Sequence, residues 1–132
     1  MKRWTYLTVV LATIMVGLFA GAALAVTASG TNGDDRIIGT NFADIIGARG
    51  GDDVVSGLRG SDSLYGNAGN DRIFGGLGED ELHGGYGNDA LYSADDLRPS
   101  RSHEDVVYCG AGRDFASIDR WDRVAGDCEE VR

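Results

Sequence analysis

The chain has almost no lysine, histidine, cysteine or proline. Lys2 is its only lysine, Pro99 is its only proline, and it has two histidines and two cysteines. A phosphate-binding loop of the Gly-Lys-Ser/Thr type needs a lysine in its glycine-rich turn, so this class of nucleotide site is excluded. Acidic residues outnumber basic ones by 21 to 12, which gives a formal net charge of −9 over 132 residues. Such an acidic surface disfavours nucleic acid and anionic membranes as partners.

The histidines and serines form no recognisable catalytic group. His83 and His103 are far apart in the sequence, and Ser102 beside His103 has no third residue to orient the pair. Two of the many acids could be imagined as the acid–base pair of a glycosidase. Acids that recur at a fixed pitch are more typical of ion ligands. The sequence therefore predicts that the chain is not an enzyme.

Residues 1–25 have the composition of a secretory signal peptide. Two basic residues precede an apolar run over 7–22, and the segment closes with Ala23-Leu24-Ala25. An uncleaved anchor is the alternative, because the 19 residues 7–25 could nearly span a bilayer. The small-residue ending favours cleavage after Ala25. We expect a secreted, extracellular product with no membrane contact, which retains ten basic and 21 acidic residues, a net charge of −11, and no lysine.

Residues 30–92 consist of seven nine-residue blocks without an insertion or deletion. The sixth position of every block is an aspartate: Asp35, Asp44, Asp53, Asp62, Asp71, Asp80 and Asp89. The eighth position is always aliphatic: Ile37, Ile46, Val55, Leu64, Ile73, Leu82 and Leu91. The fourth position is glycine in six blocks, with Phe42 as the exception: Gly33, Gly51, Gly60, Gly69, Gly78 and Gly87.

This pattern predicts a stacked coil. Glycines permit positive φ and close backbone packing, so the first six positions of a block should form a tight turn. The eighth position, between outward-facing neighbours, should be the inward side chain of a three-residue strand. Such short strands must stack on one another, as in a solenoid. The aspartates would then align and repel unless a hard cation such as calcium, which accepts six to eight oxygen ligands, lies among them.

The blocks resemble the RTX, or haemolysin-type, calcium-binding nonapeptide Gly-Gly-x-Gly-x-Asp-x-aliphatic-x. Blocks 75–83 and 84–92 match it at every position, and blocks 57–65 and 66–74 depart only at the second glycine. Block 39–47 lacks the inner glycines. The resemblance implies an all-β fold: a right-handed parallel β-roll over residues 26–92, with two blocks in each coil.

The resemblance also implies where calcium would bind. Successive loops would alternate between two edges of the roll, with Asp35, Asp53, Asp71 and Asp89 on one edge and Asp44, Asp62 and Asp80 on the other. Each ion would lie between loops one coil apart, held by these aspartates and by backbone carbonyls of the turns that contain the fourth-position glycines. This allows up to about five calcium ions, three on the first edge and two on the second. Without them, the thin apolar content and self-repulsion predict an expanded chain.

The register breaks after Tyr92. We interpret 93–103 as a loop of the coil, because seven inserted residues restore the phase and place Asp105 and Asp114 at sixth positions. Residues 104–132 are expected to form a degenerate repeat and a C-terminal cap. The candidates to cover the last apolar cross-section are Phe115, Ile118, Trp121, Val124 and Val131.

Cys109 and Cys128 are the only cysteines. In an exported chain, a pair is most simply a disulfide, which here would close the C-terminal cap. A redox or metal-binding pair is the alternative, but the spacing fits neither a Cys-x-x-Cys motif nor a zinc ribbon.

Two functions are consistent with these observations. The first is a secreted calcium-binding module without enzymatic activity, which folds into the β-roll when calcium binds. The second is an accessory protein that binds or acts on extracellular polysaccharide as a hydrolase, lyase or epimerase. Rings at ninth positions, Tyr65, Phe74, His83 and Tyr92, should stack as cross-strand neighbours. They could alternatively form a platform for sugars, and a cell-surface protein also remains open as a partner.

Overall fold

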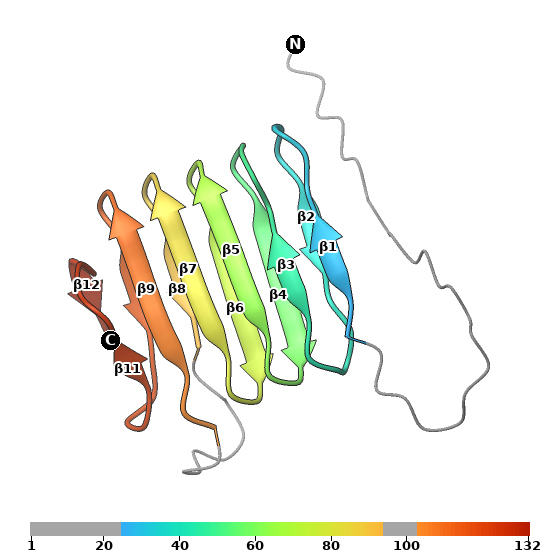
Figure 1. Cartoon of the computed structure of the whole chain (residues 1–132). Helices are drawn as coiled ribbons and strands as arrows, with labels where there is room; N and C mark the ends of the chain where they lie inside the picture. Colours follow the sequence, from blue (N-terminus) through green and yellow to red (C-terminus); the bar gives the residue numbers. More distant parts are fainter. Residues whose placement is uncertain (1–24, 94–102) are drawn as a thin grey trace.

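The computed structural model describes residues 25–93 and 103–132, and in these residues all regular structure is β (Figure 1). The predicted signal segment therefore lies outside the described residues except for Ala25. The strands are β1 (Thr27–Ser29), β2 (Arg36–Ile38), β3 (Ile45–Gly47), β4 (Val54–Arg59), β5 (Ser63–Ala68), β6 (Arg72–Leu77), β7 (Glu81–Tyr86), β8 (Ala90–Tyr92), β9 (Val106–Ala111), β10 (Phe115–Ser117), β11 (Arg123–Val124) and β12 (Glu130–Val131). No helix in this part of the chain has the length and apolar content to cross a bilayer.

The strands form two parallel sheets that face each other. One sheet has the order β1-β3-β5-β7-β9-β11, and the other has the order β2-β4-β6-β8-β10-β12. Each strand pairs with the strand one coil later, so that Ile46 lies opposite Leu64 and Leu64 lies opposite Leu82. Two blocks therefore make one coil. The predicted parallel β-solenoid is confirmed.

The coil continues in register beyond the break that follows Tyr92. Leu82 pairs with Val107 and Leu91 pairs with Ala116, an offset of 25 residues, whereas Leu64 and Leu82 are 18 apart. This is the offset that a seven-residue insertion requires. Residues 94–102 of the predicted loop lie outside the described residues.

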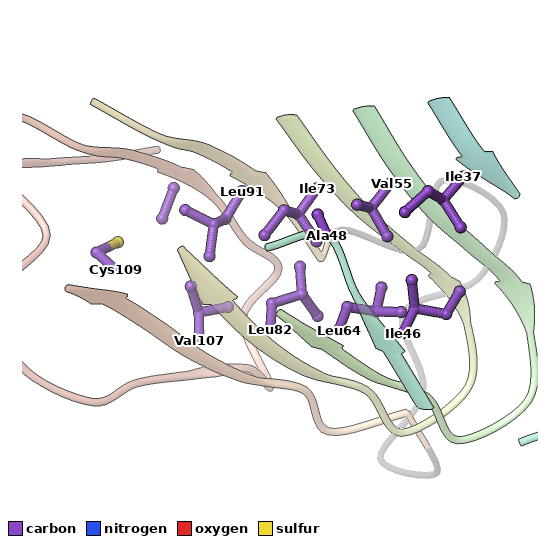
Figure 2. Close-up of a cluster of buried hydrophobic side chains, with 11 residues drawn as sticks. Ile37, Ile46, Ala48, Val55, Leu64, Ile73, Leu82, Leu91, Val107 and Cys109 are labelled. Carbon is purple, nitrogen blue, oxygen red and sulfur yellow. The ribbon is translucent and has the colours of Figure 1, made fainter. Parts of the chain in front are cut away.

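The core is one aliphatic side chain wide on each sheet. Figure 2 shows the two facing rows, with Ile37, Val55, Ile73 and Leu91 opposite Ile46, Leu64, Leu82 and Val107. All of these side chains have no exposed surface except Ile37, which is 5% exposed. Burying one such side chain contributes about 1.5–3 kcal/mol. Because only one residue in nine makes this contribution, the stability of the coil depends strongly on the interactions within the loops at its two edges.

The strands in the middle coils are longer than the predicted three residues. Strands β4 to β7 each contain six residues, because the first positions of the next block continue the pairing across coils, as Leu58 does with Gly76, even though both of these residues have positive φ. The turn proper is therefore shorter than the predicted six residues.

The cap also differs from the prediction. Phe115 points outward and contacts Tyr92 with its ring tilted by 59°, and Val131 is 44% exposed. Ile118 packs against the core as predicted, and Cys128 in its disulfide, which was not among the predicted covering residues, also packs against it.

Candidate metal centre

Two ladders of aspartates follow the two edges of the coil. In each ladder, a carboxylate oxygen Oδ1 accepts a hydrogen bond from the backbone N–H of the aspartate one coil earlier. On the first edge the bonds join Asp35 to Asp53 (2.7 Å), Asp53 to Asp71 (2.8 Å) and Asp71 to Asp89 (2.8 Å). On the second edge they join Asp44 to Asp62 (2.7 Å) and Asp62 to Asp80 (2.9 Å). The structure thus brings together, one coil apart, the seven predicted aspartates in two groups.

Both ladders extend further than the predicted set. Asp89 donates its N–H to Asp114 at 2.8 Å, and Asp80 donates its N–H to Asp105 at 2.7 Å. The nine-residue register, resumed after the insertion, was the signal that could have added these two aspartates to the predicted ligands. The last rungs are Glu129, whose Oε2 accepts from Asp114 N at 2.7 Å, and Asp122, whose Oδ1 accepts from Asp105 N at 3.2 Å. These two lie off the nine-residue register, and the signal that could have found them is the acid-x-aliphatic spacing of the repeat, which recurs with Val124 and Val131.

The second carboxylate oxygen, Oδ2, points into the aspartate's own loop. A Cβ on Gly57 would lie 2.2 Å from Asp62 Oδ2, which explains why glycine suits the first position of that block. In five rungs Oδ2 is buried without a hydrogen-bond partner: Asp53, Asp62, Asp71, Asp89 and Asp114. The whole residues are only 1–2% exposed. A buried, unpaired carboxylate is costly, and a cation is the group that relieves this cost.

The same burial changes the acidity of these carboxyl groups. Loss of solvent raises the pKa of Asp53 to about 7 and the pKa of Asp62 and Asp89 to about 6. It also raises the pKa of Asp71 and Asp114. Neighbouring carboxylates add to the increase, while the hydrogen bond from the preceding rung opposes it. Near neutral pH these loops therefore favour either a proton or a metal cation.

The donor set suits a hard cation with oxygen ligands. Within residues 25–93 and 103–132, no three acidic, histidine or cysteine side chains converge on one point. A cation in a loop would therefore take one or two carboxylates and complete its shell with backbone carbonyls, a mixture that calcium accepts. The residues present fit calcium, because five buried carboxylate oxygens have no hydrogen-bond partner.

The fourth-position glycines allow successive loops to touch through their backbones. A Cβ on Gly69 would lie 1.9 Å from the carbonyl oxygen of Gly51, and one on Gly78 would lie 1.8 Å from that of Gly60. Five of the six predicted glycines have positive φ, between 106° and 144°: Gly51, Gly60, Gly69, Gly78 and Gly87. Gly33, in the first loop, is not in this conformation.

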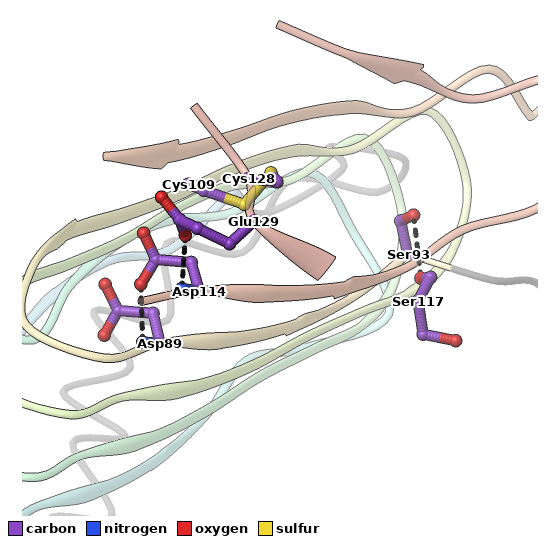
Figure 3. The surroundings of a disulfide bond; sticks show 7 residues. All are labelled: Asp89, Ser93, Cys109, Asp114, Ser117, Cys128 and Glu129. Atoms are coloured by element: carbon purple, nitrogen blue, oxygen red, sulfur yellow. Dashed lines mark hydrogen bonds between the residues drawn. A yellow bond between two sulfur atoms is a disulfide. The ribbon is translucent and has the colours of Figure 1, made fainter. Parts of the chain in front are cut away.

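The predicted disulfide is present and lies at the end of one ladder (Figure 3). Cys109 and Cys128 are joined, with their Cα atoms 5.2 Å apart. Cys109 occupies the first position of its block and is fully buried in the core. Because Cys128 directly precedes Glu129, the bond holds this last carboxylate beside Asp114.

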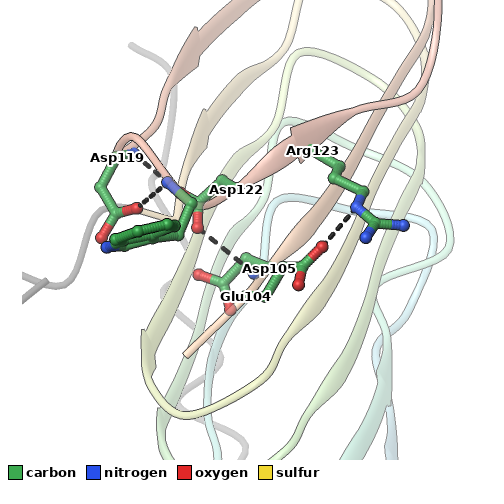
Figure 4. A network of polar contacts seen from close by, with 6 residues as sticks. Glu104, Asp105, Asp119, Asp122 and Arg123 are labelled. Atoms are coloured by element: carbon green, nitrogen blue, oxygen red, sulfur yellow. Dashed lines mark hydrogen bonds and ion pairs between the residues drawn. The ribbon is translucent and has the colours of Figure 1, made fainter. Parts of the chain in front are cut away.

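The end of the other ladder is held by a polar network (Figure 4). Oδ2 of Asp122 accepts hydrogen bonds from Ser93 Oγ and from Asp119 N, both at 2.8 Å. Glu104, beside this rung, forms an ion pair with Arg123. The terminal carboxylate Asp122 therefore has donors from its own chain on both oxygens.

Stacked rings line the outer faces of both sheets, as the sequence predicts. Tyr65 and His83 stack with centroids 4.6 Å apart, and Phe74 and Tyr92 with centroids 4.7 Å apart. Tyr108 extends the first stack at 4.5 Å from His83, whose Nε2 lies 2.8 Å from Glu81 Oε1. The ring faces in each stack cover one another.

A family model described as RTX calcium-binding nonapeptide repeat (4 copies) matches the chain over residues 29–64, 47–82 and 65–96. These matches together cover about half of the 132 residues. No curated protein and no solved structure matches the chain.

Proposed function

Because the chain belongs to the RTX calcium-binding nonapeptide-repeat family, we propose that it is a secreted, non-enzymatic module that folds into its β-roll when calcium binds. The observation that carries this proposal is the set of five buried Oδ2 atoms without partners, at matching places along the two edges. Each lies in a loop of the same design, so one kind of cation would serve them all.

The chain's own residues perform most of the folding step. Each aspartate uses Oδ1 to hold the backbone of the preceding coil and leaves Oδ2 inside its loop, as Asp62 and Asp71 do. Calcium, when bound, supplies the positive charge and the further coordination that these oxygens lack. Without it, the rungs repel one another along each edge, and the thin core has little surplus to offset that repulsion.

Secretion is the second part of the proposal. Its support is the signal-like composition of residues 1–25 and the cysteine pair, which is typical of oxidising compartments. In a compartment with little calcium the acidic chain would stay loose enough for export. Extracellular calcium would then condense it into a rigid rod that acts in structure or interaction. Expression of the full chain tests this part: the product in the medium should begin near Val26, and retention of the leader in a membrane fraction would contradict it.

Calorimetric titration of the exported product tests calcium binding. We expect a saturable heat with calcium and a much weaker response to magnesium, which demands a smaller octahedral shell. The absence of a calcium heat at millimolar concentration would contradict the proposal.

Polysaccharide binding is less well supported by the geometry. Sugar rings pack against exposed aromatic faces, but Phe74 and Tyr92 present their faces to each other. This arrangement favours stiffening of the roll. A retention assay on immobilised polysaccharides tests this alternative. Retention of the wild-type protein that is lost in a Phe74→Ala, Tyr92→Ala double variant would support a sugar-binding surface on these rings.

A further inference from the structure

The first loop on each edge is built differently from the loops that follow. In the first-edge loop, Asp35 Oδ2 accepts hydrogen bonds from Thr31 N at 2.5 Å and from Thr31 Oγ1 at 2.9 Å. In the second-edge loop, Asp44 Oδ2 accepts from Thr40 N at 2.5 Å, and Thr40 Oγ1 donates to the same carboxylate, at 3.1 Å from Oδ2 and 3.0 Å from Oδ1. The oxygen that lacks a partner in later loops therefore has two donors here, both from the threonine at the second position of the same block.

The backbone at the second position separates the two kinds of loop. In later loops this residue is left-handed, even where it is not glycine: φ is 81° at Arg49, 80° at Leu58 and 74° at Asn67. The aspartates of these three loops, Asp53, Asp62 and Asp71, all have an unpartnered Oδ2. The same holds for the loops of Gly85 and Gly110, with Asp89 and Asp114. Thr31 and Thr40 are not left-handed, and their amides bond to the loop aspartate instead.

The chemistry of the side chain explains this division. A β-branched residue with positive φ is a strong steric outlier, whereas glycine adopts that conformation freely and asparagine tolerates it. Threonine at the second position therefore selects the closed form of the loop. Its hydroxyl adds a second donor to the carboxylate, as in a local side-chain turn.

We propose that Thr31 and Thr40 close the first loop on each edge in place of an ion, so that the ladders begin to bind calcium only at the loops of Asp53 and Asp62. This inference rests on the proposed function. It replaces the expectation that Asp35 and Asp44 hold calcium, and it makes the first coil a cap that needs no metal.

The position of these loops gives the arrangement a physical reason. A loop at the end of a solenoid has a neighbouring coil on one side only, so an ion there would find fewer ligands, and end repeats are generally atypical. The far end of the second-edge ladder shows the same solution, because Asp122 Oδ2 is closed by Ser93 Oγ and Asp119 N. In-chain donors thus replace an ion at both ends of that ladder.

Two matched aspartates on the second edge test the proposal. Asp44 and Asp62 both use Oδ1 to accept a backbone N–H from the preceding coil, at 2.9 Å from Val26 and 2.7 Å from Asp44. They differ in whether Oδ2 is closed. Bound calcium is counted by native mass spectrometry of the exported protein, with circular dichroism in calcium to verify the roll. Asp44→Asn should keep the wild-type count, and Asp62→Asn should lose at least one ion.

The outcomes separate this proposal from the one on which it rests. Equal loss in Asp44→Asn and Asp62→Asn overturns the closed first loop and leaves calcium binding intact. A wild-type protein that binds no calcium overturns both. A second pair of variants keeps the proposal testable if an aspartate variant does not fold. Asn67→Thr should close the loop of Asp71 and lose an ion, whereas Asn67→Gly should keep the full count of bound calcium. Full occupancy in Asn67→Thr would overturn the role given to threonine.

Discussion

Replacing Asp53 with asparagine should stabilise the roll without calcium and destabilise it with calcium. Asp53 is 1% exposed, its Oδ1 accepts the N–H of Asp35, and its Oδ2 has no partner. Asparagine keeps the Oδ1 acceptor and removes the charge. Burial raises the pKa of Asp53 from 3.8 to about 7. Ionising it in the folded, ion-free state above pH 8 therefore costs on the order of 4 kcal/mol relative to the unfolded chain.

In chelator, asparagine avoids this cost, although its amide gains no new partner, so we expect a gain of about 1–4 kcal/mol. In calcium, the variant keeps this gain but loses the stabilisation from a bound ion, which is about 5.5 kcal/mol when calcium is about 10,000 times its dissociation constant and so exceeds the gain. The sign of the effect should therefore reverse between the two conditions.

Far-UV circular dichroism at pH 8 measures both effects. In chelator, trimethylamine N-oxide drives folding, and Asp53→Asn should fold at a lower concentration than wild type. In calcium, urea should unfold the variant first. Asp34→Asn is the matched control, because Asp34 is exposed and also accepts a backbone N–H, from Asp52 at 2.9 Å. It should shift stability by less than about 0.5 kcal/mol in both conditions. Shifts of the same sign in chelator and calcium would refute the reasoning.

Three further predictions concern protons, the core and the disulfide. The raised pKa of Asp53, Asp62 and Asp89 means that the ion-free roll gains stability as pH falls through 7 toward 4, and that calcium binding near pH 6 releases protons. Calorimetry in two buffers of different ionisation enthalpy should detect this release, and identical heats would contradict it. Leu64→Ala should lower the free energy of unfolding in calcium by about 2–5 kcal/mol, because Leu64 is fully buried. This is measured by urea titration. An effect of Leu64→Ala no larger than that of Ser56→Ala, on the outer face, would contradict the assignment of Leu64 to the core. Reducing the Cys109–Cys128 bond, which spans 19 positions, should cost about 3 kcal/mol, and an unchanged urea midpoint would contradict that estimate.

The repeat made most of the fold predictable. Because one coil takes two blocks, the positions of Asp62 and Leu64 in one block determine those of Asp80 and Leu82 one coil later, and the pairing follows. The same arithmetic located the coil beyond the insertion. The alternation also predicted which rings would stack, as Phe74 and Tyr92 do.

The ends of the coil were less predictable, because there the neighbour on one side is missing and local contacts decide. Asp122 and Glu129 join the ladders from outside the register, one through a polar network and the other through its place next to a disulfide. Phe115 occupies an outward strand position, which its apolar character alone did not reveal. At the other end, the sequence does carry a signal for the loops closed by threonine, namely a β-branched residue where the repeat has glycine. The effect of that residue on the loop depends on the backbone conformation.

Far-UV circular dichroism of the exported protein in millimolar calcium and in chelator tests most directly whether cation binding along the two aspartate ladders drives folding. We expect a β-rich spectrum in calcium that changes to that of an expanded chain in chelator and returns when calcium is restored. The same compact β spectrum in both solutions would contradict the account.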